Sequence, residues 1–134
     1  MGVIKTDNFR TAPNTEKTTE SASSVLLDYG LDALAAILHE SAKEKGFWDG
    51  EHNFDKFGNK LALVHSEVTE ILEAIRKSKG SREIVEETAD VLIRLLDLYA
   101  ALRNAGIVED SLDDILDHKV DKNRNRPRLH GNLF

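Results

Sequence analysis

Apolar residues recur at helical spacing along most of this chain. The four helices that this spacing predicts run from Val25 or Leu31 to Lys45, from Phe54 to Ser78, from Arg82 to Asn104, and from Ser111 to about Lys122. Gly46 ends the first, Ser81 is the expected N-cap of the third, and Ser111 opens a capping box for the fourth. Because no segment reads as a convincing strand, the pattern predicts an all-α fold.

The third predicted helix is apolar around more than half of its circumference, and such a helix must be covered on several sides. Two long and two shorter helices can build a bundle. However, the other three helices of one small chain are too few to cover Leu92, Leu95 and Tyr99 together with the other apolar residues. We therefore expect a bundle of about four helices that is completed by oligomerisation.

The first 24 residues differ from the rest because they are polar, rich in Ser and Thr, and without periodicity. We interpret residues 1–24 as a flexible N-terminal extension. Residues 25–134 then form a single helical domain with a basic C-terminal tail.

Composition narrows the function classes. The chain has 134 residues, of which 40% are hydrophobic and 31% charged, with a net charge of -6 and no cysteine. Apolar runs are too short to cross a bilayer and no signal-peptide core follows Met1, so we expect no membrane and a cytoplasmic location. The negative charge argues against general nucleic-acid binding.

The most informative pattern is acidic. Glu67 and Glu70 lie three residues apart on the second predicted helix, and Glu87 and Asp90 on the third. A helical hairpin can bring these four carboxylates together, and the usual remedy for their repulsion is a divalent cation with oxygen ligands. We therefore predict a Mg²⁺ site, with Mn²⁺ as a possible substitute.

Acids at helical spacing are more often a solvated face, but Glu67 falls inside the apolar arc of its helix, where an unpaired acid is costly. A di-iron carboxylate site is discarded, because those bundles use Glu-x-x-His pairs and none is present.

Five basic residues within residues 119–128 form either a solvated tail or clamps for phosphates.

Four blocks of residues resemble one family. They are Glu44–Asp49, Lys60–Glu67, Ala89–Asp97 and the Lys119-x-x-x-Asn123-x-x-Arg126-Pro-x-x-His-Gly pattern. Together with the paired acids they resemble the short, single-domain MazG-like all-α nucleoside triphosphate pyrophosphatases, over roughly residues 31–131. Lys122, where an aromatic residue is common, and Asn132-Leu133, in place of a usual Gly-Lys, depart from the family pattern.

The resemblance implies hydrolysis of a nucleoside triphosphate between the α and β phosphates, with a lean towards deoxynucleotides and nucleotide-pool house-cleaning. It also implies a homodimer or a dimer of dimers. By similarity, Lys119, Asn123 and Arg126 contact the outer phosphates. Glu67 and Glu86 are the alternatives for the general base.

Two further residues are candidate substrate contacts. Lys60 is either a phosphate contact or a surface lysine, and Trp48 either stacks on the base or belongs to the core or an interface. The alternative function is a non-catalytic helical interaction protein that retains the fold, although retention of all four acids favours an enzyme. A second enzymatic alternative is hydrolysis of another metabolite that contains a pyrophosphate group.

Overall fold

The computed structural model describes residues 20–132, and every regular element within them is helical. The elements are α1 (Ala22–Tyr29), α2 (Leu31–Glu44), α3 (Phe54–Arg76), α4 (Ser81–Asn104), α5 (Leu112–Arg124) and a 3₁₀ turn, η1 (Arg128–Gly131). The all-α prediction is confirmed over this range. Of the predicted extension, residues 1–19 lie outside the described part, while residues 22–24 form the first turn of α1.

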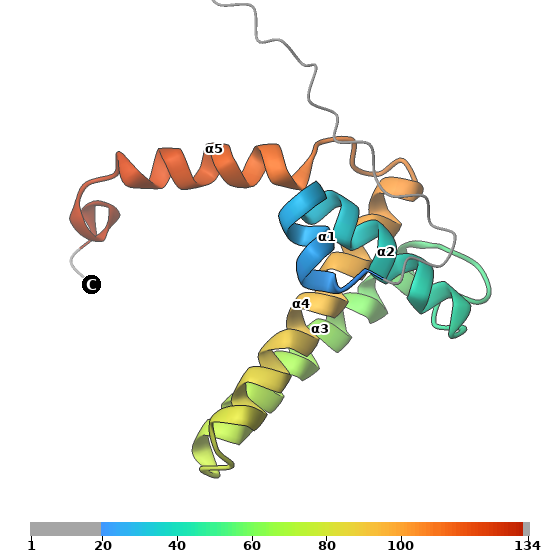
Figure 1. The fold of residues 1–134 in the computed structure, drawn as a ribbon, viewed down its shortest axis with the longest axis horizontal. Helices are drawn as coiled ribbons and strands as arrows, with labels where there is room; N and C mark the ends of the chain where they lie inside the picture. Colours follow the sequence, from blue (N-terminus) through green and yellow to red (C-terminus); the bar gives the residue numbers. More distant parts are fainter. Residues whose placement is uncertain (1–19, 133–134) are drawn as a thin grey trace, which may run out of the picture.

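The architecture is a long hairpin of α3 and α4 with shorter helices around one end (Figure 1). α2 packs against α4 near that end, and α1 packs on α2. α5 packs mainly on α2, and its first residue, Leu112, also donates its N–H to the Tyr99 hydroxyl of α4 at 2.9 Å. In Figure 1 the rest of α5 extends away from the hairpin. One chain therefore does not form a closed four-helix bundle.

The structure divides the first predicted helix into α1 and α2 at Gly30, which the sequence pattern did not predict. Gly30 has φ +92°, a conformation that side chains other than glycine rarely adopt. A Cβ atom there would also lie 2.9 Å from the carboxylate oxygens of Asp113 on α5. The break thus turns the chain and leaves room for Asp113.

The remaining helix boundaries lie close to their predicted positions. α3 ends at Arg76, two residues before the predicted end, and Ser111 caps α5 by accepting a hydrogen bond from the Asp114 N–H. The Ser81 prediction is wrong: Ser81 is the first residue of α4, and Gly80, with φ +104°, occupies the N-cap position. A glycine suits the sharp turn between the two long helices.

The core lies at the packed end of the hairpin. In one cluster Trp48 packs with Phe57 of α3 and with Leu98 and Ala101 of α4. In a second, Ala35 of α2 meets residues of α4. Because small residues line this second contact, α2 can approach α4 closely.

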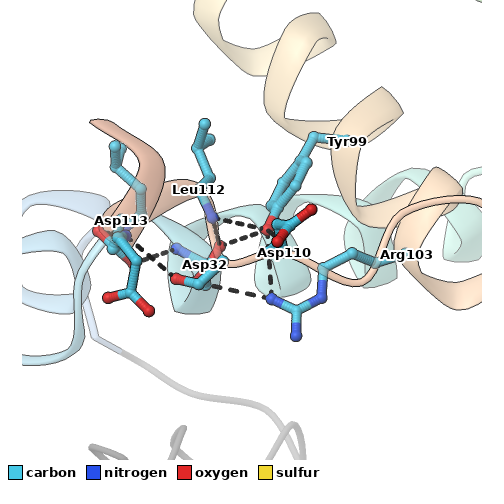
Figure 2. A network of polar contacts seen from close by, with 9 residues as sticks. Asp32, Tyr99, Arg103, Asp110, Leu112 and Asp113 are labelled. Atoms are coloured by element: carbon cyan, nitrogen blue, oxygen red, sulfur yellow. Dashed lines mark hydrogen bonds and ion pairs between the residues drawn. The ribbon is translucent and has the colours of Figure 1, made fainter. Parts of the chain in front are cut away.

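Two aspartates tie α2 to α5 (Figure 2). The Asp113 carboxylate accepts hydrogen bonds from the N–H groups of Leu31 and Asp32, at 2.8 and 2.9 Å, at the start of α2. The Asp32 carboxylate in turn accepts from the Leu112 N–H at 3.0 Å, at the start of α5. Each helix therefore supplies the acid that satisfies unpaired N–H groups of the other.

Asp32 also accepts hydrogen bonds from the hydroxyls of Tyr99, at 2.6 Å, and Ser111, at 2.5 Å. Burial alone raises the pKa of Asp32, but these hydrogen bonds to its charged form outweigh burial and hold the pKa below its ordinary value. The ionised carboxylate is thus the form that holds α5 in place.

Away from the core, the hairpin leaves large apolar side chains exposed. On α3 and α4 they include Leu61, Val68, Leu72, Ile75, Val85, Leu92, Ile93 and Leu95. Val85 has 62% of its surface exposed and Leu92 55%. As expected, one chain leaves part of the apolar surface of its third predicted helix, α4, uncovered.

Replacing Asp113 with alanine should lower the free energy of unfolding by about 1–2 kcal/mol, because two helix N–H groups lose their acceptor. Chemical denaturation followed by circular dichroism measures the change. Asp114→Ala is the matched control, since Asp114 is exposed and its side chain makes neither of these bonds. Equal effects of the two substitutions would contradict the capping role.

Candidate functional site

Three of the four predicted acids meet on the α3–α4 hairpin. One carboxylate oxygen from each of Glu67, Glu87 and Asp90 lies within 4.8 Å of the other two. Glu67 and Glu87 are partly buried and Asp90 is exposed. Three oxygens this close can bind one hard cation after small side-chain rotations, so the donor set fits Mg²⁺ or Mn²⁺.

Glu70, the fourth predicted acid, is exposed and lies outside this group of three. Its charge nevertheless acts on Glu87. Partial desolvation, followed by the negative charges of Glu70 and Asp90, raises the pKa of Glu87 above its ordinary value. The acids thus form a strongly negative surface around Glu87.

Arg94 explains how Glu67 is tolerated on an apolar face. The side chain of Glu67 is only 16% exposed, and its Oε1 atom accepts a hydrogen bond from Arg94 Nε at 2.5 Å. This ion pair offsets part of the cost of burying the acid. Glu86, the other candidate base, is exposed, pairs with Arg82 at 2.8 Å and lies outside the group of three.

A pocket of about 420 Å³ opens beside the acids. Its lining includes Glu67 of α3 and Asp90, Arg94 and Asp97 of α4. The opposite wall comes from α2 and the loop after it, with the residues Leu38, Ser41, Ala42, Lys45 and Phe47. The pocket therefore has acids at one end and a mixture of apolar and charged groups elsewhere.

Asp97 is fixed from behind by two buried side chains. Its Oδ1 atom lies 2.7 Å from His39 Nδ1, and Trp48 Nε1 donates to both of its oxygens at 2.9 and 3.0 Å. His39 and Trp48 are 2% and 3% exposed. Because both partners are held in the core, the carboxylate has a set orientation at the pocket wall.

Lys60 lines the pocket, where a substrate contact would lie. It precedes Glu67 by seven residues, so it lies about two helical turns away from the acids along α3. Its Nζ atom donates to the Phe47 carbonyl at 2.5 Å and lies 4.7 Å from the centre of the Trp48 ring. Burial lowers the pKa of Lys60, while the charge of Asp97 acts in the opposite direction. Lys60 thus belongs to the end of the pocket where Asp97 lies.

Trp48 lies in the core rather than on the pocket lining. Its ring packs edge-on against His39, with centroids 5.1 Å apart, and belongs to the cluster with Phe57. The sequence left open whether Trp48 stacks on a base or belongs to the core or an interface, and in this structure its ring packs in the core. Phe47, its neighbour, is 58% exposed and does line the pocket.

The predicted phosphate contacts of the tail are not brought to the acids within one chain. Lys119 and Asn123 are exposed on α5, which packs on α2 and meets α4 at its first residue, Leu112. Arg126 follows α5, and its Nη1 atom lies 2.7 Å from His130 Nδ1. The basic residues of the tail and the carboxylates of the same chain therefore do not form a common binding site in this structure.

Sequence reasoning named neither Phe47, Arg94 nor Asp97 as a site residue. Arg94 and Asp97 follow Asp90 by four and seven residues, the spacing of one helix face. That spacing could have drawn attention to both. Phe47 had no such signal, because its position depends on how the loop after α2 folds.

Comparison of the chain with protein-family models, with curated proteins and with solved structures found no match. Within residues 20–132, none of the helices has the length and apolar character needed to cross a bilayer.

Replacing Glu87 with glutamine should raise the melting temperature in chelator-containing buffer at neutral pH. The reason is relief of repulsion from Glu70 and Asp90, since like charges at short range destabilise the folded state. Differential scanning calorimetry measures the shift. Glu109→Gln, at an exposed position outside this cluster, is the control, and a lower melting temperature for Glu87→Gln alone would contradict the prediction.

Proposed function

We propose that this protein hydrolyses (deoxy)nucleoside triphosphates between the α and β phosphates, with Mg²⁺ as cofactor. The observation that carries the proposal is the gathering of Glu67, Glu87 and Asp90 beside a pocket that also contains Arg94. Carboxylates that can hold a cation, next to a cationic side chain, suit a polyphosphate ligand. The products are a nucleoside monophosphate and pyrophosphate, and the biological role is nucleotide-pool house-cleaning.

Glu67, Glu87 and Asp90, with Glu70 beside them, are the residues that hold the metal. When bound, Mg²⁺ neutralises charge on the phosphate oxygens. Glu67 lines the pocket and Glu86 does not, so Glu67 is the better positioned to accept a proton from the attacking water. Arg94, which pairs with Glu67 and lines the same pocket, would be placed to donate to the phosphates of a bound substrate.

We further propose that the active species is a homodimer or a dimer of dimers. Its support is the exposed apolar surface of α3 and α4, together with the position of α5. α5 is held to its own chain at its start, where it packs on α2 and Leu112 bonds to Tyr99. The exposed side chains of Lys119, Asn123 and Arg126 further along can therefore contact phosphates held by a second copy. The tail then adds positive charge to that of Arg94 beside the acids.

Product analysis tests the reaction directly. Incubation of each common dNTP with protein and Mg²⁺ should give the monophosphate and pyrophosphate, without accumulation of diphosphate, as measured by ion-exchange chromatography. In ¹⁸O-water the label should enter the monophosphate, because water attacks the α-phosphorus. Label in pyrophosphate alone would place the attack at the β-phosphorus and overturn the assignment of roles.

Variants connect that reaction to the acids. Glu67→Gln and Asp90→Asn should each lower kcat/KM by at least about 100-fold, the scale seen when a group acting on the transition state is lost. Glu109→Gln should match the wild-type protein. A wild-type protein that binds no nucleotide and hydrolyses none, while still self-associating, would favour the interaction-protein alternative that its exposed apolar surface also fits.

The assembly is tested by light scattering. The wild-type protein should have at least twice the chain mass of 15.0 kDa, and Leu95→Glu should return it to a monomer, because a charge cannot be buried unpaired at the contact. Ile107→Glu is the matched control: Ile107 is 46% exposed and Leu95 45%, but Ile107 lies outside the hairpin. A fully active wild-type monomer would contradict the proposal.

A further inference from the structure

The end of the pocket away from the acids has its own chemistry. Asp97 of α4 and Lys60 of α3 lie there, each seven residues along its helix from the acids Asp90 and Glu67. The same end contains the aromatic ring of Phe47 and the small apolar side chain of Ala42. Lys60 is already engaged by the Phe47 carbonyl and by the charge of Asp97. Because a negative carboxylate and apolar walls are unsuited to phosphates, this end takes a different part of a ligand.

The Asp97 carboxylate has hydrogen-bonding capacity left to offer. Oδ1 already accepts from His39 and Trp48, whereas Oδ2 accepts only the Trp48 contact, at 3.0 Å, among the described residues. An ionised carboxylate has about four lone-pair sites and no donor. Its remaining capacity therefore selects an N–H or O–H group of the ligand and repels a carbonyl oxygen.

Length agrees with a nucleotide that spans the pocket. The seven residues from Asp90 to Asp97 correspond to about 10 Å along the helix axis, at 1.5 Å per residue. That separation is comparable to the distance from the phosphorus of a nucleoside monophosphate to the outer edge of its base. Phe47, which is half exposed on the lining, supplies a ring on which a base can stack.

We propose that Asp97 determines base specificity by accepting a hydrogen bond from an exocyclic amino group. The preferred substrates are nucleotides of cytosine and adenine, whose amino groups lie at the ring position that faces Asp97. Uracil, thymine and hypoxanthine are rejected, because a carbonyl oxygen stands at that position and is repelled by the carboxylate, while their ring N–H lies one position away. The inference rests on the proposed function, since it takes the nucleotide phosphates to lie at the acids.

Asp97 acts directly on the base in this scheme, and His39 and Trp48 act as positioning residues. They hold the carboxylate so that it cannot turn away from an unsuitable base. A site built to pair a polar group rejects the analogue that lacks it, because the buried group of the protein is then left unpaired.

Two pairs of substrates that differ at one group provide the test. They are dCTP against dUTP and dATP against dITP, in which an amino group is replaced by an oxo group. For the wild-type protein, kcat/KM should favour the amino member of each pair by at least about 100-fold, within the range for a site that hydrogen-bonds its substrate. Equal values for both members would overturn the proposal.

Asp97→Asn then tests the residue itself. The Asn oxygen can keep the bonds from Trp48 and His39, which directs the amide N–H₂ into the pocket as a donor. The ratio of dCTP to dUTP efficiency should fall at least tenfold, with the dUTP value rising. Asp55→Asn, an exposed change on α3 outside the pocket, should leave the ratio unchanged. An equal loss on both substrates would mean that Asp97 only supports the fold, and would overturn the proposal.

Binding separates this inference from the proposed reaction. Trp48 is the only tryptophan and touches Asp97, so its fluorescence reports on the pocket when dCMP or dUMP is added. Tighter binding of dCMP without any hydrolysis of dCTP would support the specificity role of Asp97 and refute the catalytic proposal. Failure of the wild-type protein to distinguish the two monophosphates would refute the specificity role.

Discussion

The antiparallel register of α3 and α4 is the constraint on which the site depends. It sets acids of one helix opposite acids of the other: Glu70 acts on Glu87, and Glu67 lies with Asp90. Towards the core end of the hairpin, seven residues before Glu67 and seven after Asp90, the same register sets the unlike charges of Lys60 and Asp97 near each other. A one-residue change in register would turn every one of these side chains by about 100° around its helix.

The repulsion built into this register has to be offset, and the structure offsets only part of it. Arg94 pairs with Glu67, while Glu87 keeps a raised pKa and faces acids. Apolar packing at the other end of the hairpin holds the two helices together regardless. The free energy gained by packing in the core thus compensates for the repulsion between the carboxylates of the hairpin. Such unfavourable charge arrangements are common at functional sites.

Local patterns explain what the sequence could predict. Apolar spacing identified the helices because each buries one face, and three-residue spacing identified the acids because it sets neighbours on a helix surface. The break at Gly30 was not predictable in this way, since it accommodates Asp113 from a helix more than 80 residues away. Asp97 was missed because its importance depends on His39 and Trp48, which are distant in the chain.

The proposal on which the others depend is that the acids of α3 and α4 hold a divalent cation. Anomalous scattering from crystals grown with Mn²⁺ tests it most directly, because Mn²⁺ takes the oxygen ligands that Mg²⁺ takes. We expect an anomalous peak at about 2.0–2.2 Å from carboxylate oxygens of Glu67, Glu87 and Asp90, the bond length of a small hard cation. No peak among these residues at saturating Mn²⁺, in crystals where the acids are well ordered, would contradict it.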